Sequence, residues 1–157
     1  MKITALEEYG LRCMLLLAKS SEATLTLTDF SQREGLSVPY AGKLLMILKK
    51  AELVRAVRGR NGGYALTRIA SEIYLKEIFD ALGEPVFSPT HCQKYSGEEE
   101  ICVHKGDCSV RDIWRGFGGL IGTVLERITL DDIASGNLDV IKNLQLVPVE
   151  HNQNDET

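Results

Sequence analysis

The chain has 157 residues, of which 44% are hydrophobic and 25% charged, a composition typical of one soluble globular domain or a small domain with an appendage. It has no apolar run near the roughly 18 residues that span a bilayer, and acidic residues and an arginine interrupt its N-terminal segment, so the sequence predicts neither a membrane partner nor a signal peptide. We therefore expect a cytoplasmic protein whose cysteines stay reduced.

The net charge of −4 is unevenly distributed along the chain. Residues 1–70 hold eleven lysines and arginines against six acidic residues, whereas residues 71–157 hold seven against sixteen. A basic N-terminal half suits contact with nucleic acid on one face, although the acidic pI of about 5.4 for the whole chain hides it. Random scatter of surface charge is the alternative.

The first predicted helix spans about residues 5–19. Thr4 and Glu7 form a capping box at its start, and apolar residues follow at helical spacing. Cys13 lies among leucines in this helix, which indicates a buried structural cysteine. The stretch TLTLT, residues 24–28, alternates in polarity and suits a short strand or an extended connection.

The next two predicted helices have the layout of a helix-turn-helix. Thr28 is expected to cap a short helix that ends at Gly35. Ser37 is expected to cap a longer helix that runs to about residue 51. In this motif the second helix enters the major groove with its N-terminal residues toward the bases. The candidates for base contact are Ser37, Pro39, Tyr40, Ala41, Gly42 and Lys43. The alternative is an ordinary three-helix packing unit, because this spacing is weakly specific.

A basic hairpin is predicted directly after the third helix. Two strands, at about residues 53–58 and 64–67, are joined by GRNGG, whose asparagine and glycines favour a tight turn. Arg58, Arg60 and Asn61 lie at the tip, where they can reach phosphates or a narrow minor groove. The hairpin therefore resembles the wing of a DNA-binding domain, with a solvated surface hairpin as the alternative.

The remaining helices suggest a dimer. After Cys108, apolar residues recur at helical spacing over about five turns, and so long an apolar face after a complete domain needs a partner. A second copy would also match the two-fold symmetry of DNA half-sites. We expect a mainly α fold with a small β wing: a winged helix-turn-helix domain plus a long C-terminal dimerisation helix. The expected division is residues 1–84 for DNA binding, 85–109 for a cysteine-rich loop, 110–147 for the dimerisation helix and short C-terminal elements, and 148–157 for a disordered tail.

Three of the four cysteines lie in the polar stretch HCQKYSGEEEICVHKGDC, residues 91–108. Nine residues separate Cys92 from Cys102 and five separate Cys102 from Cys108, unlike the two-residue gaps of zinc knuckles and fingers. Long, irregular gaps suit a loop around a larger object, such as an iron–sulfur cluster held by thiolates. A zinc site that adds His104 and a metal-free thiol–disulfide switch are the alternatives.

The segment LSVPYAGKLL, the wing VRGRNGGYALT and the three-cysteine loop before DIW resemble the winged-helix regulators that include IscR, NsrR and RirA. The resemblance covers roughly residues 1–135. It implies a homodimeric transcription factor whose cysteine loop holds an iron–sulfur cluster, either 2Fe–2S or 4Fe–4S, with Cys92, Cys102 and Cys108 as ligands.

The resemblance also bears on the fourth cluster ligand. IscR-like members have a histidine three residues after the last cysteine, where this sequence has Arg111. NsrR-like members use a carboxylate of the first helix from the other subunit, and Glu8 falls at the matching position. His104 and Asp107, inside the loop, are rivals to Glu8.

We therefore expect a DNA-binding transcriptional regulator, with repression as the expected mode, acting on a pseudo-palindromic operator. Its cluster would sense redox state, nitric oxide or the supply of iron and clusters. The alternative is a zinc- or thiol-based metal-binding adaptor or redox protein that uses a winged helix for protein contacts. The sequence shows no nucleophile–base pair, phosphate loop or cofactor motif, so we do not expect an enzyme.

Overall fold

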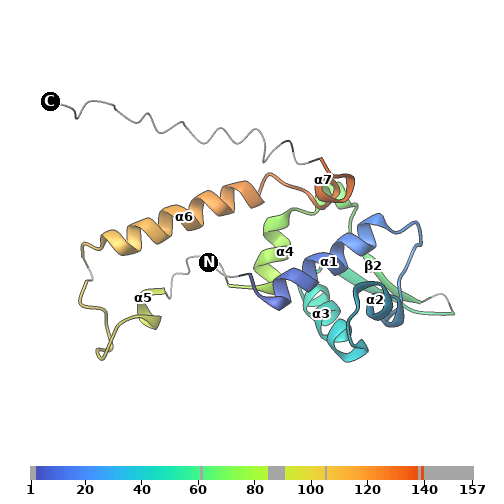
Figure 1. Ribbon diagram of the computed structural model, residues 1–157, viewed down its shortest axis with the longest axis horizontal. Coiled ribbons are helices and arrows are strands. Elements are labelled where there is room, and N and C mark those ends of the chain that lie inside the picture. The colour runs from blue at the N-terminus through green and yellow to red at the C-terminus, as the bar shows by residue number, and fades with distance from the viewer. Residues whose placement is uncertain (1–2, 61, 85–90, 105, 138, 140–157) are drawn as a thin grey trace.

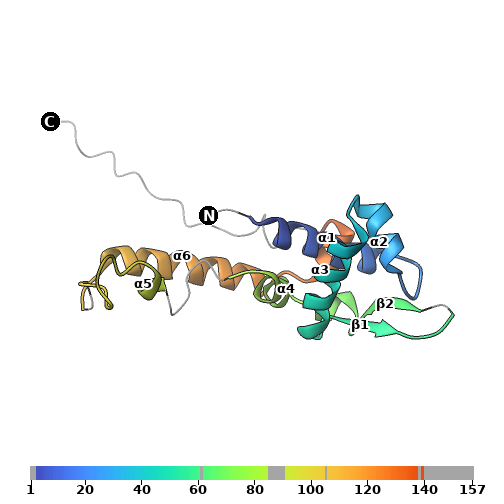
Figure 2. The same ribbon diagram turned by 90° about the horizontal axis from the view of Figure 1, so that it is seen from below.

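The structure, a computed structural model, describes residues 3–60, 62–84, 91–104, 106–137 and 139. A helical body holds most elements, and one long helix, α6, extends away from it (Figures 1 and 2). None of the described helices is long and apolar enough to cross a membrane. The elements in chain order are α1 (Ala5–Lys19), α2 (Leu27–Glu34), α3 (Val38–Lys50), β1 (Val54–Val57), β2 (Gly63–Leu66), the 3-10 turn η1 (Ala70–Glu72), α4 (Leu75–Leu82), α5 (His91–Lys94), α6 (Ser109–Leu125) and α7 (Leu130–Ser135).

The body has one hydrophobic core, formed by α1–α4, the small sheet and α7. The largest fully buried side chains are Met14, Leu25, Phe30, Leu44, Leu45, Leu48, Leu53, Ile73, Ile78 and Leu130. The C-terminal segment joins this core because the amide of Leu75 donates to Ile128 O at 2.9 Å and that of Leu130 donates to Ile73 O at 2.8 Å. The core therefore includes residues well beyond position 84, and the tail at 148–157 lies outside the described residues.

Helix α2 begins earlier than the sequence analysis predicted. Its N-cap is Thr26, whose hydroxyl accepts from the amide of Asp29 at 3.2 Å, while the Asp29 carboxylate accepts from the Thr26 amide and hydroxyl at 2.7 Å each. These hydrogen bonds lower the pKa of Asp29. The prediction that Thr28 caps the helix is wrong, because only Thr26 has a carboxylate three residues later to complete a capping box.

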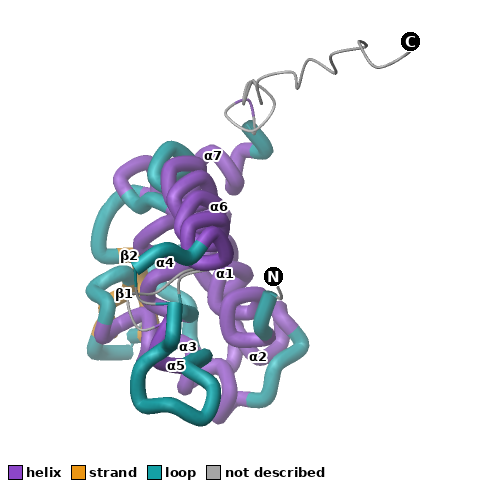
Figure 3. Tube along the Cα trace, turned by 90° about the vertical axis from the view of Figure 1, so that its left-hand side faces the viewer, coloured by secondary structure: helices purple, strands orange, loops and turns teal. Residues whose placement is uncertain are grey.

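The wing is a two-stranded antiparallel sheet at one edge of the body, with Val54 opposite Leu66 and Val57 opposite Gly63 (Figure 3). The preceding connection adds one bridge, between Leu25 and Tyr64. A Cβ on Gly63 would lie 2.5 Å from Leu25 O, so this close approach requires glycine. The stretch TLTLT is therefore an extended connection that pairs with the wing.

Helix α6 has no buried residue, in contrast to α1, α3 and α4. Only its C-terminal residues Val124 and Leu125 pack against the core of the body among the described contacts. A Cβ on Gly116 or Gly119 would meet no atom of the described chain within 4 Å. Packing within the described chain therefore gives no reason for glycine at these two positions.

Candidate DNA-binding surface and cysteine loop

Helix α3 presents one face to the core and the opposite face to solvent. Pro39 and Lys43, one turn apart, are exposed on the outer face. Ala41 is fully buried, so its predicted place among the base-contacting residues is wrong. A Cβ on Gly42 would make an ordinary contact with α2, 3.9 Å from Leu27 Cδ2, and Gly42 is half-buried, so it lies at the edge of the outer face next to α2.

Two other predicted contacts, Ser37 and Tyr40, also have structural roles. The Ser37 hydroxyl caps α3 by accepting from the amide of Tyr40 at 3.3 Å, which leaves its O–H proton as a donor for a phosphate. The half-buried ring of Tyr40 packs edge-on against Tyr9 of α1, with ring centroids 6.0 Å apart and an interplanar angle of 88°. Tyr40 therefore connects α1 to the N-terminal end of α3.

A charged side chain strengthens this α1 contact. The Arg12 guanidinium lies over the Tyr9 ring at 5.4 Å, and its Nε is 2.9 Å from Glu34 Oε2 at the end of α2. Together these contacts hold α1, α2 and α3 in one arrangement beside the turn of the helix-turn-helix. The sequence does not predict these contacts, because no short-range pattern marks contacts between separate helices.

The wing carries its cations at the tip, as predicted. Arg58 and Arg60 are exposed on either side of Gly59, whose φ of +116° suits glycine. Asn61, the third residue predicted at the tip, lies outside the described residues. The amide of Gly62 donates to Gly59 O at 3.0 Å and closes the described part of the turn.

The exposed cations of α3 and the wing have no ion pair among the described residues, a property that they share with Lys19 at the end of α1. Within the described part of the chain, ion pairs engage Arg12, Arg33 and Arg68 but none of the exposed cations of α3 and the wing. Those exposed cations are Lys43, Lys49, Lys50, Arg55, Arg58 and Arg60. Lysines and arginines without carboxylate partners are the groups that can neutralise phosphates and release counterions.

The three loop cysteines are placed on separate elements. Cys92 lies in α5, Cys102 in the irregular segment after it, and Cys108 at the N-cap of α6; all three are free and half-buried. Lys94 forms an ion pair with Glu84 and so ties α5 to the end of α4. Among the described residues, no three His, Cys, Asp or Glu side chains converge on one point that could hold a metal ion.

Cys108 is held in place at the start of α6. Its sulfur accepts from the amide of Arg111 at 3.4 Å and caps the helix. The Arg111 guanidinium donates to Gly106 O at 3.3 Å and so organises the loop before Cys108. A guanidinium is not a metal ligand, so Arg111 supports the loop where IscR-like members have a histidine.

Cys13 is separate from this set. It is fully buried in α1, and its burial, with the nearby Glu34 carboxylate as a smaller cause, raises the pKa of its thiol to about 12. A thiol that stays protonated at neutral pH neither binds metal nor attacks readily, which agrees with the predicted structural role.

The three candidates for a fourth ligand are all exposed: Glu8 on α1, and His104 and Asp107 in the loop. Glu7, which precedes Glu8, takes part in the cap of α1. Its Oε2 accepts from the Thr4 amide and hydroxyl at 2.7 Å each, which completes the predicted capping box. Glu8 therefore remains exposed on α1, where nothing in the described chain requires its carboxylate.

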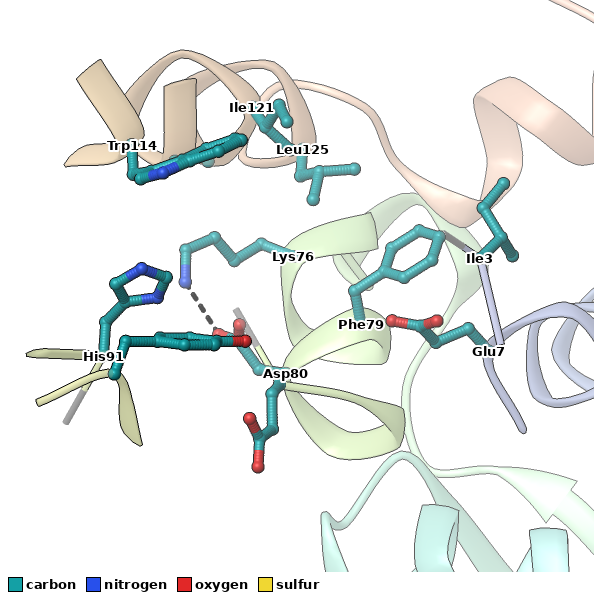
Figure 4. Close-up of a pocket in the computed structure, with 13 residues that line it drawn as sticks. Ile3, Glu7, Lys76, Phe79, Asp80, His91, Trp114, Ile121 and Leu125 are labelled. Atoms are coloured by element: carbon teal, nitrogen blue, oxygen red, sulfur yellow. Dashed lines mark hydrogen bonds and ion pairs between the residues drawn. The ribbon is translucent and has the colours of Figure 1, made fainter. Parts of the chain in front are cut away.

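A groove of about 590 Å³ lies between α4, α5, α6 and the start of α1 (Figure 4), and the sequence did not predict it. Phe79, His91 and Trp114 point into it, and the ion pair between Lys76 Nζ and Asp80 Oδ2, at 2.7 Å, lies in its middle. The lining residues come from segments far apart in the sequence, so no local motif marks the groove. It lies between the body on one side and α5 with most of α6 on the other.

A helix-turn-helix followed by a basic two-stranded wing defines a winged-helix DNA-binding protein. A model of one family in this class, Rrf2, described as an iron-dependent transcriptional regulator, matches residues 3–136, and the chain belongs to this family. The resemblance noted in the sequence and the predicted fold class are both confirmed.

Curated relatives match nearly the whole chain. The HTH-type transcriptional regulator IscR of Pectobacterium carotovorum subsp. carotovorum is 35% identical over 143 residues, covering 89% of this chain and 84% of that protein. The IscR of Serratia proteamaculans is 33% identical over 158 residues, covering 100% of this chain and 89% of that protein. Because these relatives are named as transcriptional regulators, the predicted non-enzymatic role is confirmed.

Solved structures agree with the fold. T. potens IscR has a TM-score of 0.68 and 32% identity, covering 87% of this chain and 88% of that one. CymR, named as the global cysteine regulator of B. subtilis, has a TM-score of 0.69 and 28% identity, covering 87% of this chain and 98% of that one.

Proposed function

We propose that this transcriptional regulator is a cytoplasmic homodimeric repressor whose affinity for a pseudo-palindromic operator is set by an iron–sulfur cluster in its cysteine loop. The proposal has three parts: the DNA contact, the cluster and the dimer. Each rests on a different set of residues, so each can fail without the others.

The DNA contact rests on charge. The outer face of α3 and the tip of the wing carry exposed cations that make no ion pair within the described chain, whereas Arg33 and Arg68 are paired with carboxylates. We assign base contacts to Lys43, Pro39 and the outer edge of Tyr40, a phosphate contact to Ser37, and phosphate or minor-groove contacts to Arg58, Arg60 and Asn61.

The proposal of an iron–sulfur cluster is based on the cysteines that could serve as its ligands. Cys92, Cys102 and Cys108 are half-buried free thiols on one short segment, and the Cys108 sulfur is held at the N-cap of α6 by the amide of Arg111. The description of the family and the naming of its IscR relatives point to iron. A bound iron–sulfur cluster would supply a redox-active group that oxidants or nitric oxide can modify. The three cysteines would hold the cluster, and Arg111 would keep the loop before Cys108 in position through its hydrogen bond to Gly106 O.

The dimer rests on α6. Its apolar side chains include Ile113, Phe117 and Leu120, which are 57%, 49% and 51% exposed. A row of large apolar groups on a helix that touches the body only at its C-terminal end needs a partner to cover it. Glycines with open space above them, such as Gly116 and Gly119, would let the backbone of a second α6 approach closely.

We assign the fourth ligand to Glu8 of a second copy. Glu8 is exposed, its neighbour Glu7 is held in the cap of α1, and α6 carries the loop away from α1 of its own chain (Figures 1 and 2). A carboxylate is a weaker ligand for iron than a thiolate, so its loss would be an early step in the response. Because Glu8 is one residue from Tyr9, and Tyr9 contacts Tyr40, displacement of Glu8 has a path of direct contacts to the DNA-facing end of α3.

The observation that carries the proposal is three free half-buried cysteines in a protein of this family. Protein purified without oxygen should contain iron and acid-labile sulfide. Replacing Cys92, Cys102 or Cys108 by alanine should abolish both, whereas Cys13→Ala should retain them. Zinc at full occupancy without sulfide in native protein would contradict the cluster and favour the zinc alternative that adds His104.

A further inference from the structure

One exposed side chain on α3 belongs neither to the core nor to the cationic surface. Met46 is 53% exposed although it is large and apolar. Residues 39, 43, 46 and 50 are spaced by four, three and four, so on a helix of 3.6 residues per turn they form one row. All four are exposed, while Leu44, Leu45 and Leu48 on the opposite face are fully buried. Met46 thus lies in the middle of the row that starts with two predicted base contacts.

Neither the core nor the proposed dimer interface accounts for the apolar side chain of Met46. It does not pack against the core among the described residues. It is also remote from the apolar face of α6, because α3 and α6 lie in different parts of the molecule in both views (Figures 1 and 2). Its row neighbours Lys43 and Lys50 are cations, which favour a phosphate-rich partner over another apolar protein surface.

The chemistry of the major groove suggests what Met46 meets there. Among the four base pairs, the C5-methyl of thymine is the apolar group on the major-groove edge, and it is read by apolar side chains. The methionine side chain is unbranched and its thioether is polarisable, so it can pack against such a methyl group without needing a hydrogen-bond partner. Lysines on either side would hold the helix against the backbone while Met46 faces the bases.

We propose that Met46 is a specificity-determining residue that contacts a thymine methyl in each operator half-site. The inference rests on the proposed DNA-binding function and adds to it one base preference. It also extends the DNA-reading part of α3 by a turn beyond Lys43.

The test removes single methyl groups from the DNA. A duplex is first selected from random-sequence DNA by the parent protein, and each thymine of a half-site is then replaced by deoxyuridine, which lacks only the methyl. We expect one position at which this change weakens binding by the parent about three- to fivefold, the loss that corresponds to one buried methyl group. With Met46→Ala the same replacement should have no effect, whereas Met46→Leu should keep the penalty.

Val38→Ala is the matched control, because Val38 is also an exposed apolar residue of α3, at 44%, but lies outside the row. It should keep the uracil penalty of the parent. Penalties that are equal in the parent and Met46→Ala at every thymine would overturn this inference and leave the proposed function intact. A parent protein that selects no DNA would overturn the proposed function, and the role of Met46 with it.

Discussion

The helical body and the arm formed by the cysteine loop (residues 91–108) with α6 differ in how their side chains are used. In the body, α1, α3, α4 and the wing surround a continuous core, and capping boxes satisfy the starts of α1 and α2. In the arm, neither α5 nor α6 has a buried residue, and three thiols are free. The body has its own core, whereas the arm has exposed apolar groups and thiols that the proposed dimer and the proposed cluster would cover.

The largest effect should come from a charge on the apolar face of the arm. Phe117→Glu would place a carboxylate in the proposed dimer interface, where burying it is strongly unfavourable. We expect the mass measured by light scattering to fall from twice 17.4 kDa to 17.4 kDa. Operator affinity should fall with it, because two half-sites are then no longer bound together.

Ile69→Glu is the control for this change, because Ile69 is 65% exposed but lies on the body. It should leave the mass at the dimer value. A Phe117→Glu protein that stays dimeric would place the interface elsewhere and remove the proposed reason for the exposed face of α6.

The next effect concerns the DNA face of the body. Arg58→Ala and Arg60→Ala should each weaken operator binding about tenfold or less and lower the slope of log affinity against log salt by about one, because each removes a phosphate contact and its released counterion. Arg68→Ala should leave that slope unchanged, since its guanidinium is already 2.7 Å from Glu77 Oε2. Equal slopes for all three variants would count against the wing as a DNA contact.

A smaller effect is expected where body and arm meet across the dimer. Glu8→Ala should alter the visible spectrum of the anaerobic protein and speed cluster loss in oxygen severalfold, because water would replace a protein ligand. His104→Ala should change neither. The reverse result would place the fourth ligand inside the loop and end the cross-subunit route from cluster to DNA.

The smallest effect tests the body alone. Thr26→Ala should lower the free energy of unfolding by about 1 kcal/mol in urea titrations, the typical value for an N-cap, whereas Thr28→Ala should change it little. The contribution of the Asp29 carboxylate is present above its ordinary pKa of about 3.9 and is lost as pH falls through its lower folded-state pKa. The difference in free energy of unfolding between Thr26→Ala and Thr28→Ala should therefore become smaller in acid. If Thr28→Ala were the less stable variant at neutral pH, the assignment of Thr26 as the N-cap would be contradicted.

Local patterns account for what could be predicted. Each of these patterns joins residues that are close in sequence: the N-caps of α1 and α3, the turn of the wing, and the apolar residues that recur along α6. The structure has each of them where the sequence predicted it. The Thr28 error was avoidable, because Thr26 and Asp29 are a complete capping box in the sequence.

Contacts between distant segments could not be predicted in the same way. Nothing local links Tyr9 to Tyr40, or Ile73 to Leu130, because each pair depends on how whole helices pack. The fourth ligand is harder still: its donor is assigned to another molecule, and no sequence pattern within one chain reports the distance between two copies. The exposure of Met46, at 53%, is likewise an observation of the structure, in which Leu44, Leu45 and Leu48 are fully buried.

We propose that the state of the arm controls the DNA affinity of the body. The most direct measurement compares one operator duplex against anaerobic protein with its cluster and against the same protein after the cluster is removed by a chelator, at one salt concentration. We predict Kd values that differ by about tenfold or more, within the typical range for coupled sites. Equal Kd values for the two forms, with the dimer intact in both, would contradict this claim.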